Sequence, residues 1–272
     1  MGSSEEQKAF LEEHSDFLAR FPTLKKIVEK AVCRPLAPPP KGEVERLREL
    51  PDGDPQVVAF ENRMMTNKAI FFLGRIAADD FSEILILSGN GRGIGAYKIL
   101  RGMYERVVYA SYLDKNEDKS RLFARKGFVD KQKLATRLLE FGIDLLSDFS
   151  PQDKIELETR AAEARKDMPL LAVPEMAEKI DMSLKRLYGP CHLEPTIHIH
   201  ASAFGMERRL RQLPGGGFRY NDDDYRPQAR RALIFGHQLL LRILSLQNTR
   251  FQLGMDDEVQ ECLMAFQEIW GR

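Results

Sequence analysis

Helical periodicity dominates this 272-residue chain, and only one short run, EILILS (83–88), is a candidate for a β-strand. Four apolar residues between positions 56 and 88, for example, recur at the spacing of one helical face: Val58, Met65, Phe72 and Ile76. A stable sheet needs several strands that pair with one another, so one candidate strand cannot build it. The sequence therefore predicts an all-α fold, a multi-helix bundle of about seven to nine helices with no substantial sheet.

The expected helical segments cover most of the chain. We expect them at residues 5–32, 56–88, 94–115, 117–147, 150–167, 173–188, 195–212, 227–252 and 256–270. The first of these is predicted to be two short amphipathic helices that break near FPT (21–23). The segment LPGGGFRYNDDDYRP (213–227) is predicted to be a polar loop that could cover a site as a lid. Its Asp222 to Asp224 fit a cap for the next helix better than a metal site.

The start of the helix at 150–167 carries a local signature. Ser150 is the expected N-cap, and Pro151 stands in the first turn, where its missing N–H group costs nothing. Asp153 occupies the position at which a capping box normally has Glu or Gln. These three residues predict where this helix begins.

One composition shift suggests a domain boundary. Consecutive prolines in CRPLAPPPKG (33–42) favour a stiff, extended linker. We therefore predict an N-terminal helical arm with its linker at 1–42 and a main helical domain at 43–272. The arm can pack on the main domain or reach a second copy of the chain, and a homodimer is one expected assembly.

Charge and cysteine content exclude several function classes. The 41 basic and 41 acidic side chains cancel, so no overall field attracts nucleic acid or an anionic membrane. The three cysteines are far apart in the sequence and fit neither a disulfide framework nor a zinc site, which favours a reducing compartment: Cys33, Cys191 and Cys262. The first residues have no apolar signal region, and no apolar run approaches the ~20 residues of a membrane helix. A cytoplasmic protein without a membrane segment is expected.

The glycine-rich turn SGNGRGIG (88–95) admits two interpretations. Gly91, Gly93 and Ala96 satisfy the dinucleotide-binding pattern G-x-G-x-x-A, and Asp114 lies about 20 residues further on, where an acidic residue would meet a ribose. A dinucleotide-binding fold, however, alternates several strands with helices, and this chain offers only one strand candidate. We therefore interpret the turn as the end of one helix at a left-handed glycine, followed by the start of the next helix.

A charged pair lies on the helix that follows this turn. Five residues share one apolar face of the helix: Ile94, Tyr97, Tyr104, Val108 and Tyr112. Arg101 falls within that face, and Glu105 follows it by four residues, the spacing at which side chains on a helix meet. A guanidinium on an apolar face is costly unless it is paired. The pair is therefore either an ordinary intrahelical salt bridge or a paired charge at a functional site.

Three of the five histidines fall within CHLEPTIHIHASAFGMERR (191–209). If a helix begins near Pro195, His200 lies on its inward side, and His198 faces solvent beside Ser202. A buried His200 could meet Glu105 and act as an acid or base near neutral pH, or it could be a core histidine satisfied by a backbone carbonyl. His198 and His200 point apart on a helix and lack the spacing of metal ligands, so no metal is expected.

The predicted helix at 117–147 is strongly basic. Seven basic residues fall in this segment: Lys119, Arg121, Arg125, Lys126, Lys131, Lys133 and Arg137. Phe123 and Phe128 are interleaved with them. Such a face is either solvated or a surface for the phosphates of RNA or a nucleotide.

Three segments together resemble a known family. The helix with Arg101-Gly-Met-Tyr-Glu105, the segment EDKSRLFARKGF and the block LYGPCH…IHIHAS are similar to a bacterial helical family, catalogued as domain of unknown function 5677, over roughly residues 60 to 250. The family motif would correspond to Arg101, Glu105, His200 and Ser202, and the resemblance implies a helical fold without an established reaction. Arg186 and His192 also resemble the R-x(4–6)-H signature of the helical HEPN ribonucleases, although Gly189 and Pro190 are expected to break the helix between them.

Two functional hypotheses follow. The first is a binding or regulatory helical module, in a bacterial stress or defence system, with a structural polar cluster. The second is a hydrolase of RNA or another phosphodiester, in which Glu105 or His200 is the general base and Arg101 stabilises developing negative charge. The predicted catalytic residues are Arg101, Glu105 and His200, and the predicted binding residues are His198, Ser202, Tyr104, Arg125 and Lys126. No metal or other cofactor is predicted, RNA or a nucleotide is the expected ligand, and whether the chain is an enzyme stays open.

Overall fold

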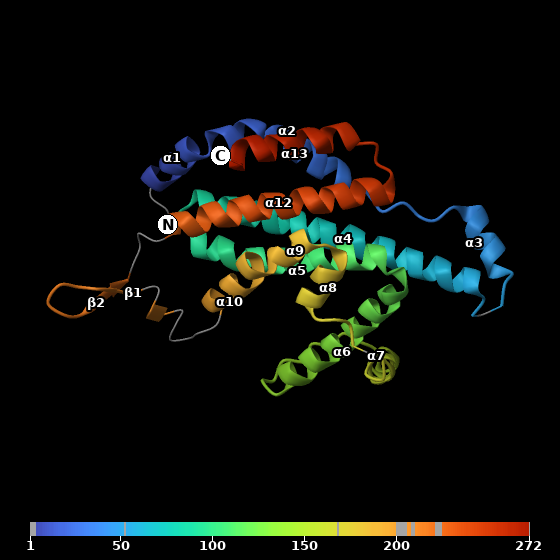
Figure 1. Cartoon of the computed structure of the whole chain (residues 1–272). Coiled ribbons are helices and arrows are strands. Elements are labelled where there is room, and N and C mark those ends of the chain that lie inside the picture. The colour runs from blue at the N-terminus through green and yellow to red at the C-terminus, as the bar shows by residue number, and fades with distance from the viewer. Residues whose placement is uncertain are drawn as a thin grey trace. The chain divides into compact units, whose positions relative to one another are not determined.

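The structure is a computed structural model that describes residues 4–51, 53–167, 169–199, 206–207, 210–220 and 225–271. The chain divides into two compact units, to which helices α4 and α5 both contribute (Figure 1). Unit 1 comprises Met1–Leu36, Ile70–Tyr112 and Val173–Arg272, and unit 2 comprises Ala37–Ala69 and Leu113–Ala172.

The described residues are almost entirely helical, which confirms the predicted all-α class. The α-helices are α1 (Ser4–Glu13), α2 (Ser15–Val32), α3 (Lys41–Arg48), α4 (Pro55–Gly89), α5 (Gly93–Lys115), α6 (Ser120–Leu139), α7 (Pro151–Ala164), α8 (Val173–Ile180), α9 (Met182–Arg186), α10 (Glu194–Ile199), α12 (Tyr225–Phe251) and α13 (Asp256–Trp270). A 3-10 turn, η1 (Glu117–Lys119), and a π-helical turn, η2 (Gly189–Leu193), complete the helical elements. None of the described helices combines the length and apolar character needed to cross a bilayer.

The glycine-rich turn separates two helices, as predicted. EILILS belongs to the last turns of α4, and α5 begins at Gly93. Gly91 adopts a left-handed conformation with φ of +66°, and the backbone N–H group of Arg92 donates to the carbonyl of Leu87 over 2.7 Å. A left-handed residue that follows a helix lets the chain return to the last free carbonyls. The turn therefore follows a helix, and not the β-strand that a dinucleotide-binding motif requires.

Several predicted boundaries were wrong. The N-terminal helices separate at His14 and not near FPT, because Pro22 lies inside α2. The basic helix α6 ends at Leu139, and Gly142 follows with a φ of +76°. Residues 210–220 form a short antiparallel hairpin of β1 (Leu210–Gln212) and β2 (Phe218–Tyr220) instead of a helix end and an open loop.

Aromatic packing holds the two ends of unit 1 together. Helices α2, α12 and α13 pack on one another (Figure 1). The ring of Phe17 on α2 lies 5.9 Å from Trp270 on α13 and 5.3 Å from His237 on α12, measured between ring centroids. Trp270 Nε1 also donates to His237 Nδ1 over 3.1 Å. The N-terminal arm thus packs on the C-terminal helices of the same chain.

Helix α12 also packs closely on α4. The side-chain amide of Gln247 is fully buried, and its Nε2 donates to the carbonyl of Ile70 over 3.0 Å and lies 3.3 Å from that of Phe71. A Cβ atom added at Gly74 would overlap Gln247 Nε2. Glycine at position 74 therefore permits this contact between the two helices.

The outer face of α4 carries large apolar side chains that are exposed. Ile70, Phe81 and Ile84 are buried, whereas Phe72 and Ile76, which belong to the apolar periodicity of the sequence, are 51% and 42% exposed. The periodicity correctly predicted a helix. It did not identify the side of the helix that the chain covers.

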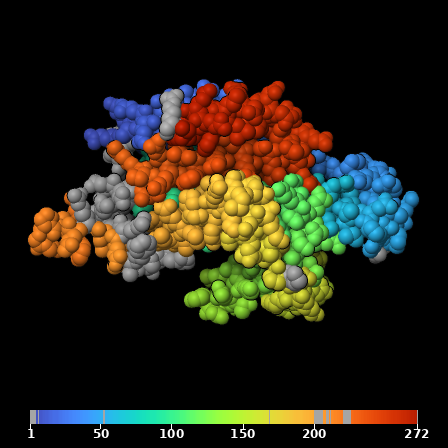
Figure 2. Space-filling view, in the orientation of Figure 1, coloured from blue at the N-terminus to red at the C-terminus, as the bar shows by residue number. Residues whose placement is uncertain are grey.

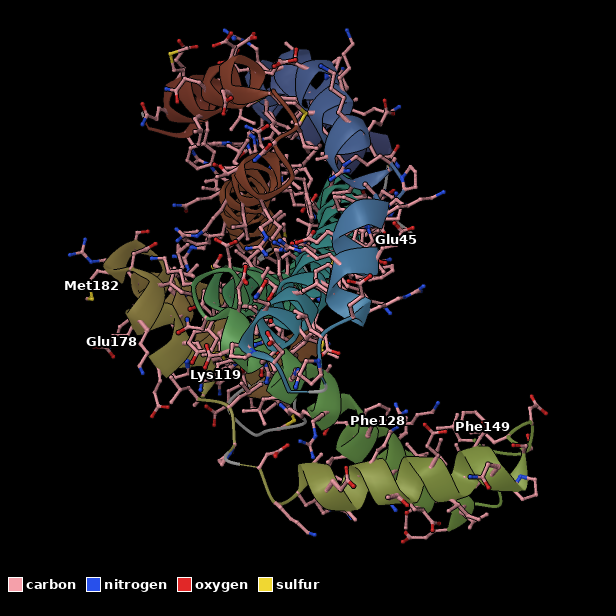
Figure 3. All side chains as sticks on the ribbon, turned by 90° about the vertical axis from the view of Figure 1, so that its right-hand side faces the viewer. Glu45, Lys119, Phe128, Phe149, Glu178 and Met182 are labelled. Atoms are coloured by element: carbon pink, nitrogen blue, oxygen red, sulfur yellow. The ribbon has the colours of Figure 1, made fainter. Side chains whose placement is uncertain are left out.

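In unit 2, α6 and α7 pack on each other. The capping box at the start of α7 is confirmed, because Ser150 Oγ accepts from the N–H group of Asp153 over 3.2 Å and Asp153 accepts from the N–H group of Ser150 over 3.3 Å. A cavity of about 430 Å³ is lined by residues that include Phe128 on α6 and Phe149 before α7, both labelled in Figure 3. Arg125, predicted to bind RNA, forms an ion pair of 3.3 Å with Asp167.

Candidate functional site

A π-helical turn places one histidine beside α5. Gly189–Leu193 continue the helical path between α9 and α10 as a π-turn, in which the N–H group of Glu194 donates to the carbonyl of Gly189. The expected break between Arg186 and His192 is present, because α9 ends at Arg186 and the π-turn begins at Gly189, with Pro190 in its first turn, where it needs no donor. The extra residue of a π-turn rotates the side chains that follow it, and such turns are frequent at functional sites.

His192, on this turn, contacts the charged pair of α5. Its Nε2 lies 2.9 Å from Glu105 Oε1. Arg101 Nε donates to the same oxygen over 3.2 Å, so the predicted pairing of Arg101 with Glu105 is confirmed. These three side chains are named here the Arg–Glu–His cluster. The side chain of Arg101 is 27% exposed, that of Glu105 is 34% exposed and that of His192 is 14% exposed. The carboxylate and the guanidinium are therefore partly open to solvent, whereas the imidazole is mostly enclosed.

Aromatic side chains enclose the imidazole. The ring of Tyr188 is stacked on His192 at 4.8 Å with 20° between the planes, and the ring of Tyr104 meets it edge-on at 6.2 Å. Tyr104 is completely buried and donates its hydroxyl proton to the carbonyl of Leu184 over 3.0 Å. Burial and the cation of Arg101 lower the pKa of His192, although Glu105 acts in the opposite direction. The neutral imidazole is therefore favoured at neutral pH.

A second carboxylate lies one residue beyond the π-turn. Tyr97 donates its hydroxyl proton to Glu194 Oε2 over 2.6 Å, and Arg231 Nη1 donates to Glu194 Oε1 over 3.0 Å. Burial and the bond to Glu194 raise the pKa of Tyr97, which keeps this phenol protonated. Figure 2 shows the surface of α8 to α10, in yellow, beside that of α12, in orange. Glu194 thus joins α5, α10 and α12 next to the cluster.

Cys191 does not contribute a nucleophile to the site. Its thiol is completely buried, and burial raises its pKa far above the ordinary value, with Glu194 adding to the shift. A thiol in such surroundings stays protonated and inert. Within the part of the chain that the structure describes, no three His, Cys, Asp or Glu side chains converge as metal ligands would.

The structure brings together only some of the predicted site residues. Arg101 and Glu105 are paired as expected, but His200 and Ser202 lie outside the described residues. The expectation that His198 faces solvent was wrong, because it is only 6% exposed and its ring lies 6.2 Å from that of Tyr97. The predicted helix start near Pro195 was nearly correct, since α10 begins at Glu194, but the side of this helix that faces the core was misassigned.

The remaining predicted residues have other surroundings. Tyr104 packs beneath the cluster, and its role in binding stays a prediction. Arg125 and Lys126 belong to unit 2, whereas the Arg–Glu–His cluster belongs to unit 1. Their proposed contact with RNA stays a prediction as well.

His192 is the residue that the histidine pattern did not single out. The R-x5-H spacing from Arg186 includes His192, but Arg186 is exposed and only His192 meets the α5 pair. Glu105 and His192 are 87 positions apart in the sequence. No local spacing could therefore predict their contact.

The fold and the site define an all-α protein. Its Arg–Glu–His cluster lies between a long helix and a π-turn. A comparison with models of protein families matches residues 68–218 to the family of unknown function DUF5677. The match covers more than half of the chain, so the chain belongs to this family. Neither the curated proteins nor the solved structures contain a match.

Proposed function

We propose that this chain cleaves phosphodiester bonds in RNA, with the Arg–Glu–His cluster as its active site. The observation that carries the proposal is the convergence of His192 Nε2 and Arg101 Nε on one oxygen of Glu105, at 2.9 and 3.2 Å. A carboxylate held by two donors has a fixed orientation, and the cation beside it can contact a phosphate.

Glu105 is the general base in this scheme. Its other oxygen, Oε2, has no partner among the described residues, and the side chain is partly exposed. The imidazole of His192 is a poorer candidate. Its Nε2 is occupied by Glu105, and its Nδ1 is buried without a partner among the described residues. His192 is therefore a positioning residue that holds the carboxylate.

RNA is the substrate that demands least from the protein, because the ribose 2′-hydroxyl is an internal nucleophile. Glu105 accepts the 2′-hydroxyl proton while the 2′ oxygen forms a bond to phosphorus. The bond from phosphorus to the 5′ oxygen breaks, its electron pair stays on that oxygen, and the oxygen takes a proton from water, while Glu105 later releases its proton to solvent. Arg101 stabilises the charge that develops on the phosphoryl oxygens. The expected first product carries a 2′,3′-cyclic phosphate.

Two variants of His192 test this assignment. Glutamine at position 192 can place an amide N–H group near Nε2 but cannot titrate, so His192→Gln is expected to keep cleavage of a 5′-labelled single-stranded RNA within about threefold of wild type. His192→Ala removes the donor and is expected to slow cleavage about tenfold or more, because a small displacement of a catalytic group is costly.

The comparison is made at several pH values, with Arg20→Lys as a matched control from an exposed ion pair of unit 1. If His192→Gln and His192→Ala lose activity equally, the imidazole transfers a proton itself and the assigned roles are wrong. If purified wild-type protein yields no cyclic phosphate, the proposal of RNA cleavage fails.

A binding or regulatory module is the second candidate function. The observation that favours it is that the charged groups of the cluster already pair with each other, since Glu105 forms an ion pair with Arg101. Retention of labelled RNA without cleavage, lost on substitution of Arg101→Ala, would support this candidate over the first.

A further inference from the structure

The exposed face of α4 in unit 1 combines large apolar side chains with ordered charges. Seven of its positions are exposed: Phe72, Arg75, Ile76, Asp79, Ser82, Glu83 and Ile86. They follow one another at intervals of three, one, three, three, one and three residues, which is a continuous stripe along the helix. From Phe72 to Ile86 the stripe is about 21 Å long.

The apolar members of this stripe are unusually open. Phe72, Ile76 and Ile86 are 51%, 42% and 63% exposed, although smaller side chains on the opposite side of the same helix, such as Ala77, are completely buried. Apolar residues repeated along one helix face at such spacing are typical of helix-to-helix contacts.

The charges of the stripe indicate what covers it. The basic residue Arg75 precedes the acidic residues Asp79 and Glu83 along the helix. In a parallel symmetric pair, each charged residue would face the same residue of the second copy, and the two like charges would repel each other. In an antiparallel pair centred on Asp79, Arg75 lies opposite Glu83 of the second copy, and Phe72 lies opposite Ile86. The face is thus complementary to itself in one orientation only.

We propose that a second copy of this chain covers the face, with the two α4 helices antiparallel and related by a twofold axis near Asp79. Each Asp79 at the axis is offset by Arg75 of its own chain, whose Nε lies 3.3 Å away. This interface is independent of the Arg–Glu–His cluster, which involves α5 and η2.

Sedimentation velocity and light scattering over about 1 to about 100 μM protein test the pairing, a range in which a modest helix interface associates reversibly. Wild type is expected to approach the mass of two chains as the concentration rises. Ile76→Glu is expected to weaken association at least about tenfold, because it places an unpaired charge at the contact. Met264→Glu, at a side chain on α13 that is 51% exposed, is the matched control and should associate like wild type.

A charge exchange tests the orientation. Arg75→Glu and Glu83→Arg are each expected to weaken association, and the double variant is expected to associate more tightly than Arg75→Glu alone. The double variant and Arg75→Glu both lack the contacts of Arg75 with Asp79 and Cys33. The difference between their association constants therefore reports the contact between the two copies. A wild-type monomer at every concentration, an Ile76→Glu variant that associates normally, or a double variant no tighter than Arg75→Glu would overturn the proposal.

Discussion

Replacing Glu105 by Gln is expected to slow RNA cleavage by about 100-fold or more, the usual contribution of a general base. The amide has nearly the same size and can still accept a hydrogen bond, but it cannot take the 2′-hydroxyl proton. The rate would be measured under single-turnover conditions with excess protein, so that a change in RNA affinity does not conceal the change in the chemical step.

Glu258→Gln is a matched control for this measurement. Glu258 accepts from Lys30 Nζ over 2.6 Å, so the control also removes a carboxylate from an ion pair of unit 1, away from α5 and η2. It is expected to cleave RNA at the wild-type rate. Equal activity of Glu105→Gln and wild type would exclude Glu105 as the base, and circular dichroism would confirm that the variant is folded.

Replacing Gly74 by Ala is expected to lower the free energy of unfolding by about 4 kcal/mol, from overpacking together with a stranded buried amide. The new methyl group would occupy the position of Gln247 Nε2, which is fully buried and donates to the α4 backbone. The amide would have to turn away and lose that bond. Thermal unfolding should show a midpoint lower by about 10 °C.

A double variant separates the clash from helix propensity, which by itself favours Ala over Gly. Gly74→Ala combined with Gln247→Ala removes the overlapping amide and is expected to be more stable than Gly74→Ala alone. If Gly74→Ala unfolds at the wild-type temperature, the close contact between α4 and α12 does not exist as described.

Local features of the sequence were the ones that could be predicted. The Arg101–Glu105 pair spans four residues and the Ser150–Asp153 capping box spans three, so the helix geometry alone fixes each contact. The left-handed Gly91 is likewise a local property of a helix end. For these features the sequence contains all the interacting groups within one turn.

Features that depend on distant segments could not be predicted. The contact between His192 and Glu105 involves the π-turn, and α5 also bonds to the flanking helices through Tyr104 with Leu184 and Tyr97 with Glu194. His198 was placed on the wrong side because the helical pattern does not show which face of α10 packs on the rest of unit 1. The exposure of Phe72 and Ile76 likewise depends on which face of α4 receives α12, and periodicity alone does not contain that information.

The hydrogen bond between His192 and Glu105 can be observed by nitrogen NMR of the histidine side chains. We expect a neutral His192 that carries its proton on Nε2, with a pKa below the usual value of about 6.5. In Glu105→Gln that pKa should fall further, because the carboxylate that raises it is gone. A proton on Nδ1, or a His192 pKa that does not respond to Glu105→Gln, would show that Nε2 of His192 does not donate to Glu105.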